Sequence, residues 1–334
     1  MSLILARDSV LEIYESAAAR KWTIPTFCTE NLTTTEAILS GTLEFGRKKG
    51  IDNLPVTIAI TNQYAHRSQS AYYTHTRKWD LGLKLFLADI DVLTAQGSPF
   101  EKLDVMIHLD HTQWDTDTEL LKWDMGKFSM IMFDASGLPF GENIRRTAEF
   151  VRNHGSTIVI EGACDEILDA GGAEKNHLTT PEDAVRYLDE TGVDFIVANL
   201  GTEHRASGAD LKYHSSLAQR ISRLTGPKLV LHGTSSVTRD QIRNLYHDGI
   251  AKVNIWTGLE RDSSPFLLED MILNASKILG KEKTLELMRK GLLGDKVKGD
   301  SRPQLSHFTT VYRQDIIFSR MKEIVYGYLE TWYT

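Results

Sequence analysis

Short apolar runs recur along this chain at intervals long enough to hold a helix, and this alternation limits its possible folds. The runs are rich in Val, Ile, Leu or Met and lack strict polar alternation, which is typical of strands buried on both faces of a parallel sheet. There are eight: Ile24–Cys28, Pro55–Thr61, Asp104–His108, Ser129–Phe133, Thr157–Glu161, Asp194–Asn199, Lys228–His232 and Ala251–Ile255. Strands that alternate with helices in this way predict a (β/α)8 barrel, with a doubly wound parallel sheet as the alternative.

Helical patterns fill most of the intervals and continue after the last run. The expected helices between strands include Thr34–Lys49, Thr116–Met125, Glu142–His154, Pro181–Thr191 and Ser215–Thr225. The connection over residues 62–103 is long, and three further patterns follow Leu259, namely Leu267–Leu279, Glu282–Met288 and Thr310–Tyr328. Because the chain shows no internal repeat and no linker, we expect one α/β domain over residues 1–334, a TIM barrel with a C-terminal helical extension at about 260–334.

Composition and charge exclude several classes of protein. The net charge is −7, whereas a nucleic-acid-binding protein usually carries a basic patch. Two cysteines cannot form a disulfide framework, and they favour a reducing compartment. No stretch approaches the ~18 apolar residues of a membrane span, and the apolar part of the N-terminus is too short for a signal peptide. We therefore expect a cytoplasmic metabolic enzyme with neither a nucleic-acid nor a membrane partner.

Histidines, carboxylates and small polar residues follow six consecutive strands. The segments are His108-Leu-Asp110-His111, Asp134-Ala-Ser136, Glu161-Gly-Ala, Gly201-Thr-Glu-His204, His232-Gly-Thr-Ser-Ser and Asn254-Ile-Trp-Thr. The carboxyl ends of all barrel strands converge on one face, so we expect these side chains to meet there.

Four of these residues predict a metal site. His111, Glu161, His204 and His232 come from four different strands. Imidazoles with a carboxylate suit Zn²⁺ or another borderline divalent ion. A lone histidine is more often a core or surface residue, so the metal interpretation depends on the shared position at strand ends.

The motifs, taken in order, resemble those of the class II ketose-bisphosphate aldolases, which include the fructose- and tagatose-bisphosphate aldolases. The resemblance covers residues from about 20 to 305. It rests on His108-Leu-Asp-His111, Met132-Phe-Asp134-Ala-Ser136-Gly-Leu-Pro-Phe140, Gly171-Gly-Ala-Glu174, Gly201-Thr-Glu-His204, Leu229-Val-Leu-His232-Gly and Lys252-Val-Asn254. It implies a (β/α)8 barrel, a lyase of carbohydrate metabolism, and a homodimer or homotetramer for which the C-terminal helices offer a contact.

The resemblance also implies a role for each site residue. The three histidines would hold a catalytic Zn²⁺, or Co²⁺ or another divalent ion in its place, with Glu161 as the metal-site glutamate; a monovalent cation could accompany it. Asp110 would act as the acid/base at the scissile bond of a ketose phosphate, and Glu174 would move the proton at the donor carbon. Cleavage would be reversible and pass through a zinc-stabilised enediolate. The implied substrate contacts are Asn31, Thr61, Asp134, Arg205, Gly233, Ser235, Asn254 and Thr257.

Simpler alternatives remain for the two acid/base residues. Asp110 could instead orient a histidine at the metal, which is a common role for a carboxylate there. Glu174 could be a solvated carboxylate on a loop that is about four residues longer than is usual for the family.

Four departures from the family pattern predict a substrate other than fructose 1,6-bisphosphate. Arg205 replaces a glycine after His204, Thr234-Ser-Ser replaces a glycine-rich anion loop, Trp256 replaces an aspartate, and Thr112 follows His111. We expect a related ketose phosphate or a sugar-acid derivative, with Arg205 able to bind a phosphate or a carboxylate. The alternatives are an ordinary fructose-bisphosphate aldolase, a metal-dependent barrel hydrolase, and a catalytically lapsed homologue that acts as a binding subunit.

Overall fold

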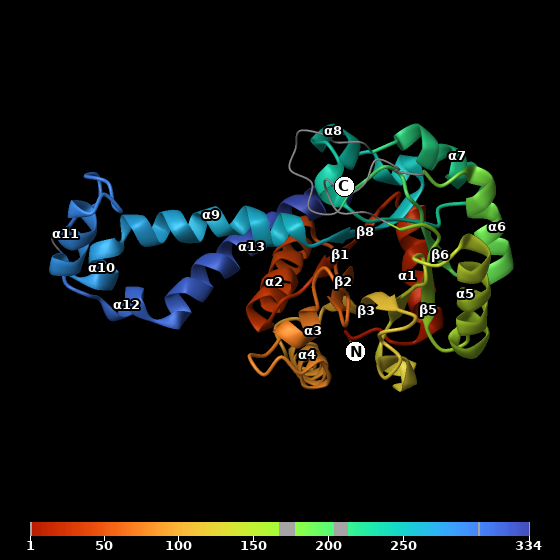
Figure 1. The fold of residues 1–334 in the computed structure, drawn as a ribbon, viewed down its shortest axis with the longest axis horizontal. Helices are drawn as coiled ribbons and strands as arrows, with labels where there is room; N and C mark the ends of the chain where they lie inside the picture. The colour runs from red at the N-terminus through yellow and green to blue at the C-terminus, as the bar shows by residue number, and fades with distance from the viewer. Residues whose placement is uncertain (1, 167–177, 204–212, 300, 334) are drawn as a thin grey trace.

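Eight parallel strands close into a barrel in sequence order, and the last strand pairs with the first (Figure 1). The computed structural model describes residues 2–166, 178–203, 213–299 and 301–333. The strands are β1 (Ile24–Cys28), β2 (Leu54–Thr61), β3 (Leu103–Gln113), β4 (Met130–Asp134), β5 (Val159–Ala163), β6 (Phe195–Val197), β7 (Leu229–Leu231) and β8 (Ile250–Ile255). The predicted barrel is therefore confirmed, and the doubly wound alternative is wrong because such a sheet has open edges.

Helices cover the outside of the barrel between most of the strands. They are α2 (Leu32–Lys49), α3 (Gln69–Tyr72), α4 (Trp79–Leu93), α5 (Phe140–His154), α6 (Pro181–Thr191), α7 (Ser215–Thr225) and α8 (Arg239–Ile242), and a further helix, α1 (Arg7–Ala19), precedes β1. The bounds of α6 and α7 are those that the sequence predicts. The long connection over 62–103 contains α3 and α4.

The segment between β3 and β4 differs from the prediction. The expected helix Thr116–Met125 is replaced by two short 3₁₀ turns, Leu120–Lys122 and Met125–Lys127. The buried Asp117 carboxylate accepts hydrogen bonds from the Asn62 side chain and from the backbone N–H groups of Gln63 and Gln113. Because this carboxylate ties the segment to the loop after β2, the local polar contacts compete with a continuous helix.

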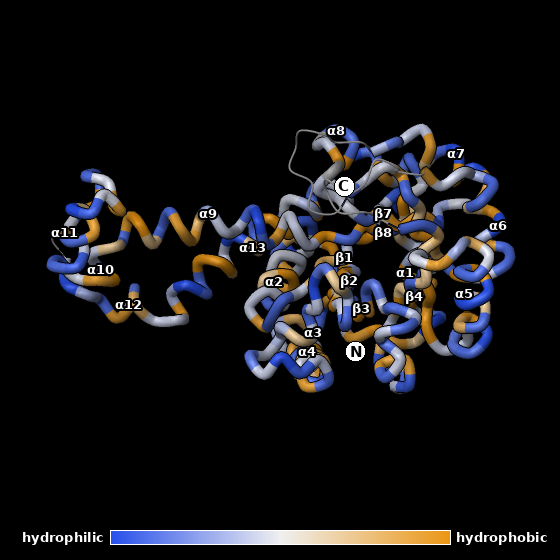
Figure 2. The backbone as a smooth tube through the Cα atoms, in the orientation of Figure 1, coloured by the Kyte–Doolittle hydropathy of each residue, from blue (hydrophilic) through white to orange (hydrophobic). Residues whose placement is uncertain are grey.

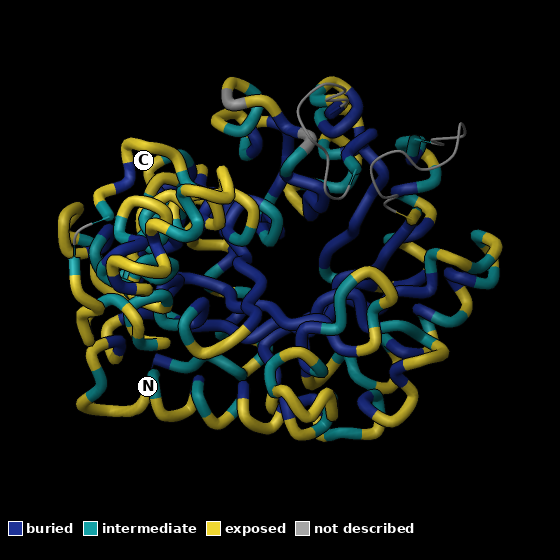
Figure 3. The backbone as a smooth tube through the Cα atoms, turned by 60° about the vertical axis from the view of Figure 1, so that its left-hand side comes forward, coloured by how far each residue is buried: buried dark blue, intermediate teal, exposed yellow. Residues whose placement is uncertain are grey.

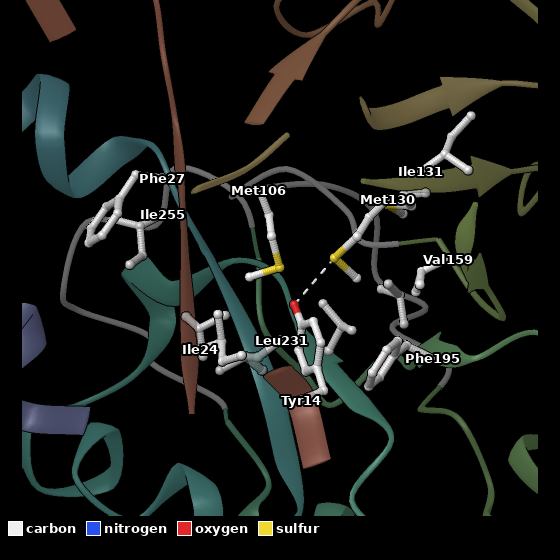
Figure 4. Close-up of a cluster of buried hydrophobic side chains, with 14 of the residues drawn as sticks. Tyr14, Ile24, Phe27, Met106, Met130, Ile131, Val159, Phe195, Leu231 and Ile255 are labelled. Atoms are coloured by element: carbon white, nitrogen blue, oxygen red, sulfur yellow. Dashed lines mark hydrogen bonds between the residues drawn. The ribbon is translucent and has the colours of Figure 1, made fainter. Parts of the chain in front are cut away.

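The amino ends of the strands are closed by α1, whose Tyr14 projects into the barrel axis (Figure 4). The Tyr14 hydroxyl donates a hydrogen bond to Met130 Sδ at 3.3 Å, and its ring lies 4.6 Å from that of Phe195. Met130 and Phe195 begin β4 and β6, so this contact lies at the bottom of the barrel. Figure 3 shows buried strands around the barrel axis. Because α1 closes the amino ends of the strands, a binding site is expected at their carboxyl ends.

The C-terminal helices form an arm that leaves the barrel and returns to it (Figure 1). Its helices are α9 (Thr257–Leu273), α10 (Ala275–Leu279), α11 (Lys281–Arg289), α12 (Leu305–Phe308) and α13 (Thr310–Trp332). On its return α13 packs against α2, where a Cβ added to Gly41 would lie 2.8 Å from the Lys322 carbonyl oxygen. The Tyr333 hydroxyl then donates to the Pro55 carbonyl at 2.7 Å, which fixes the end of the arm to β2.

Within the described part of the chain, every helix is too short or too polar to cross a membrane.

Candidate functional site

A bulge at the end of β3 brings two adjacent side chains to the same side of the strand. Between Leu109 and Thr112 β3 advances three residues while β4 advances two, from Ile131 to Phe133. His111 occupies the extra position with φ +45°, a left-handed conformation that non-glycine residues rarely adopt. Neighbouring side chains of a regular strand point to opposite faces, and a bulge reverses this alternation. Asp110 and His111 can therefore act at one site.

Asp110, His111 and His232 form a buried cluster at the carboxyl ends of β3 and β7. Each offers one ligand atom, and these atoms all lie within 4.8 Å of one another. The rings of His111 and His232 meet edge to face, with centroids 4.8 Å apart. Imidazole nitrogens are donors that a zinc-like ion prefers, and the Asp110 carboxylate lies beside them.

The surroundings of His111 hold its ring in place and favour positive charge. Its Nδ1 lies 3.1 Å from Asp134 Oδ2, and Tyr64 stacks on the ring at 4.2 Å. Burial lowers the pKa of His111, but Asp110 and Asp134 outweigh it and raise the pKa above its ordinary value. A carboxylate on the second ring nitrogen is a common way to orient a metal-binding histidine. The residues present therefore fit a divalent cation.

Asp110 is ionised in this environment. Burial by itself would raise the pKa of its carboxyl, but the neighbouring His111, His108 and His232 hold that pKa well below its usual range. The side-chain amide of Asn254 donates a hydrogen bond to Asp110 Oδ1 at 2.9 Å. The site thus presents a fixed carboxylate that can accept a proton.

Beneath the cluster, five side chains form a buried polar ring: Asp110, Asn254, Lys252, Glu161 and His108. Lys252 Nζ lies 2.6 Å from Asn254 Oδ1 and 2.7 Å from Glu161 Oε1. His108 Nε2 closes the ring, at 3.5 Å from Asp110 and 3.8 Å from Glu161. Glu161 thus lies outside the cluster that contains His111 and His232, and its carboxylate faces Lys252.

A pocket opens directly over the cluster and contains most of the predicted substrate contacts. Thr61, Gly233, Ser235, Asn254 and Thr257 line it together with Asp110 and both clustered histidines. Gly233 has φ +66°, and an added Cβ would lie 2.8 Å from the Glu203 carbonyl oxygen, so the loop after β7 requires glycine here.

Two predicted contacts lie elsewhere. Asn31 is exposed and caps α2, where its side chain accepts from the Thr34 N–H at 3.2 Å. Asp134 contacts His111 and lines a neighbouring pocket, which His111 lines as well. Glu174, His204 and Arg205, the remaining predicted residues, lie outside the described residues.

Several pocket residues were not predicted as site residues from the sequence. Arg67, Trp256, Tyr64, His66 and Arg261 line the pocket, and Lys252 lies beneath it. Arg67, Tyr64 and His66 belong to a loop with no recognisable motif. The sequence marks Trp256 as a departure from the family pattern and Lys252 as part of a family motif, just after and on β8, which ends at Ile255.

Comparisons with known proteins agree with this fold. A family model described as "Fructose-bisphosphate aldolase class-II" matches residues 8–297. A fructose-bisphosphate aldolase of Giardia intestinalis is 38% identical over 149 residues, which is 41% of this chain and 44% of that protein. One of Streptococcus pyogenes is 35% identical over 164 residues, 46% of this chain and 53% of that protein. The chain therefore matches about half the length of these curated relatives.

The crystal structure of the fructose-bisphosphate aldolase from Campylobacter jejuni is similar to the whole chain. The TM-score is 0.75, with 18% sequence identity, and the match covers 99% of this chain and 96% of that one. At this identity the similarity concerns the fold.

Proposed function

We propose that this chain, which belongs to the class II fructose-bisphosphate aldolase family, is a metal-dependent aldolase that reversibly cleaves a ketose phosphate or a related sugar-acid derivative. The observation that carries the proposal is the buried cluster of Asp110, His111 and His232, which lies under a pocket open to a small molecule. The cytoplasmic location expected from the sequence stays a prediction.

The proposed metal ion is zinc. His111 and His232 would hold it with His204, and Glu161 completes the set that the sequence predicts, although Lys252 faces its carboxylate in this structure. A bound divalent cation supplies a Lewis acid, which stabilises the negative charge that develops on the donor half of the substrate when the carbon–carbon bond breaks.

Asp110 is proposed as the general base of cleavage. Its carboxylate is ionised, lines the pocket and is fixed by Asn254, so it can accept the proton of the hydroxyl next to the scissile bond. In the synthetic direction the same carboxyl returns that proton. Glu174 remains the candidate for the proton at the donor carbon.

The phosphorylated donor half is proposed to bind the loops after β7 and β8. Gly233, Ser235 and Thr257 line the pocket there, and such loops often form the phosphate site of a barrel. Trp256 adds bulk beside them, which supports the expectation that fructose 1,6-bisphosphate is a weak substrate. Arg205 stays a candidate anchor, and an accompanying monovalent cation and a homodimeric or homotetrameric assembly are further proposals.

The test combines metal content with a cleavage assay over ketose mono- and bisphosphates. We expect about one zinc ion per chain, loss of cleavage on chelation, and recovery with Zn²⁺ or Co²⁺. Asp110→Ala should lower kcat by roughly 10²- to 10⁴-fold and keep its zinc, as expected for a general base. His111→Ala should lose both.

Three results would contradict parts of this proposal. Full activity without metal would exclude the metal mechanism. Loss of zinc from Asp110→Ala would make that residue a ligand. Zinc binding without cleavage of any ketose phosphate would indicate a lapsed homologue.

A further inference from the structure

Lys252 is a fully buried cation on β8 that lies beneath the pocket and does not line it. Its side chain is 0% exposed, and its Nζ contacts Asn254 Oδ1 at 2.6 Å and Glu161 Oε1 at 2.7 Å. Asn254, two residues further along the strand, lines the pocket together with Asp110, whereas Lys252 does not. A substrate in the pocket therefore meets Asn254 and Asp110, and any effect of Lys252 on the reaction passes through its neighbours.

Lys252 sets the direction of the Asn254 amide. A lysine ammonium has three N–H donors and no acceptor, whereas the asparagine side chain has an acceptor oxygen and a donor NH₂ group. The amide oxygen therefore faces Lys252, and the NH₂ group is left to donate to Asp110 Oδ1, at 2.9 Å. A reversed amide would place its oxygen against a carboxylate, which accepts only, and its NH₂ group against an ammonium. Both hydrogen bonds would then be lost.

The contact with Asn254 leaves the other oxygen of Asp110 for a substrate. Oδ1 accepts from Asn254, and the nearest nitrogen of His108 lies 3.5 Å from the same oxygen. Oδ2 faces the Cys28 thiol, with Sγ at 3.6 Å, and a thiol is a weak donor. Cys28 lines the pocket, as Asp110 does. Oδ2 is therefore the oxygen with the greater capacity to accept a proton.

We propose that Lys252 is a positioning residue for the general base: it fixes the Asn254 amide, which holds Asp110 with Oδ2 available to the substrate hydroxyl. This inference rests on the proposed function. The contacts that transmit the effect run beneath the pocket from Glu161 on β5 through β8 to Asp110 on β3. Proton transfer depends strongly on geometry, and a misplacement of about 1 Å lowers a rate by roughly 100-fold.

The test compares Lys252→Met with Lys252→Gln. Both side chains are uncharged and similar in length, so both leave Glu161 without its cation, but only glutamine offers N–H groups to the Asn254 oxygen. We expect Lys252→Met to lower kcat on a ketose phosphate roughly 10- to 100-fold, with KM within about threefold of the wild type, because Lys252 does not line the pocket. Lys252→Gln should stay within about fivefold of the wild-type kcat. Equal losses in both variants, no loss in either, or a loss confined to KM would overturn the proposal.

Stability and metal content are controlled separately. Gly82→Ala is a destabilised control, because an added Cβ would lie 1.8 Å from the Ser70 carbonyl oxygen and Gly82 does not line the pocket. Its kcat and KM should equal those of the wild type at a temperature where circular dichroism shows every variant folded. If Lys252→Met does not fold, Glu161→Gln is added to both Lys252 variants, which removes the unpaired buried charge. A lower zinc content in Lys252→Met than in Lys252→Gln would attribute the lost activity to the metal and overturn the proposal.

Neutron diffraction separates this proposal from the proposed function, because it locates deuterium atoms, which X-ray structures at ordinary resolution do not show, and needs no turnover. In the wild type we expect the deuterated NH₂ group of Asn254 to face Asp110. In Lys252→Met the amide should turn or the Asp110 carboxylate should move. An amide oxygen that faces Asp110 in the wild type, or an unchanged amide and carboxylate in the variant, would refute the proposal. The expected geometry in a protein that cleaves no ketose phosphate would refute the proposed function alone.

Discussion

At the residue scale, the contact on which stability depends most is the fully buried ion pair of Lys252 and Glu161. Both side chains are 0% exposed, and the pair couples to Asp110 through Asn254. Removal of one partner leaves a buried charge without compensation, whereas removal of both does not.

Lys252→Met should lower the free energy of unfolding by about 3–5 kcal/mol. Urea denaturation of this variant and of the double variant with Glu161→Met measures the difference. The double variant should regain most of the loss, and equal losses would contradict the coupling.

Glu260 gives a prediction about pH. Burial, and then the nearby charge of Glu30, raise the pKa of Glu260 to about 7, and its Oε1 has no hydrogen-bond partner within the described ranges. In the unfolded chain this carboxyl loses its proton near its ordinary pKa of 4.5. Between these values the folded state holds a proton that the unfolded state has released, so the stability falls as the pH rises and levels off above about 7.

Glu260→Gln removes this titration. The variant should become more stable relative to wild type as the pH rises from 4.5 to 7. We expect a gain of about 1–3 kcal/mol at pH 8, reduced from the full effect because the side chain is only partly buried. Denaturant unfolding of both proteins from pH 5 to 8 measures it. A difference that does not change with pH would show that Glu260 titrates normally.

At the element scale, the strands were predictable and the bulge in β3 was not. Apolar runs such as Ile24–Cys28 mark strands because both faces of a barrel strand are buried, and the run coincides with β1. The apolar run in β3 was expected to end at His108, but the strand continues to Gln113. Its last four residues are polar, so an apolar pattern does not mark them as strand. The contact of Lys252 with Glu161 and that of Arg67 with Glu30 join distant segments, and no local spacing indicates either.

Gly82 tests the packing of α4 on α3. An added Cβ would lie 1.8 Å from the Ser70 carbonyl oxygen, a backbone atom that cannot move without moving α3. Gly82→Ala should therefore lower the free energy of unfolding by about 1–3 kcal/mol, the usual cost of overpacking. Gly141→Ala, near the start of α5, is the control, because its Cβ would meet nothing within 4 Å. Thermal unfolding of the two variants should show a lower Tm for Gly82→Ala alone.

At the scale of the whole molecule, the described part of the arm exposes many of its large hydrophobic side chains. Sixteen large hydrophobic side chains are exposed in the described structure, and ten of them lie between Phe266 and Val311. Figure 2 shows hydrophobic positions along α9, and none of the residues of α12 is buried. Exposed apolar surface of this extent usually marks an interface between proteins. A second copy of this chain is the expected partner, since most soluble oligomers are symmetric homo-oligomers.

The arm therefore predicts a dimer that forms through α9. Light scattering after size exclusion should give twice the chain mass of 37.7 kDa for the wild type. Leu268 and Leu273 are 63% and 60% exposed on α9, and Leu268→Asp with Leu273→Asp should yield monomers, because a charge cannot be buried there without a partner. Val92→Asp is the control, since Val92 is 71% exposed on α4 of the barrel. A monomeric wild type, or an arm variant with the mass of the wild type, would contradict the prediction. The barrel keeps its own core in the monomer, so its melting temperature should stay close to that of the control.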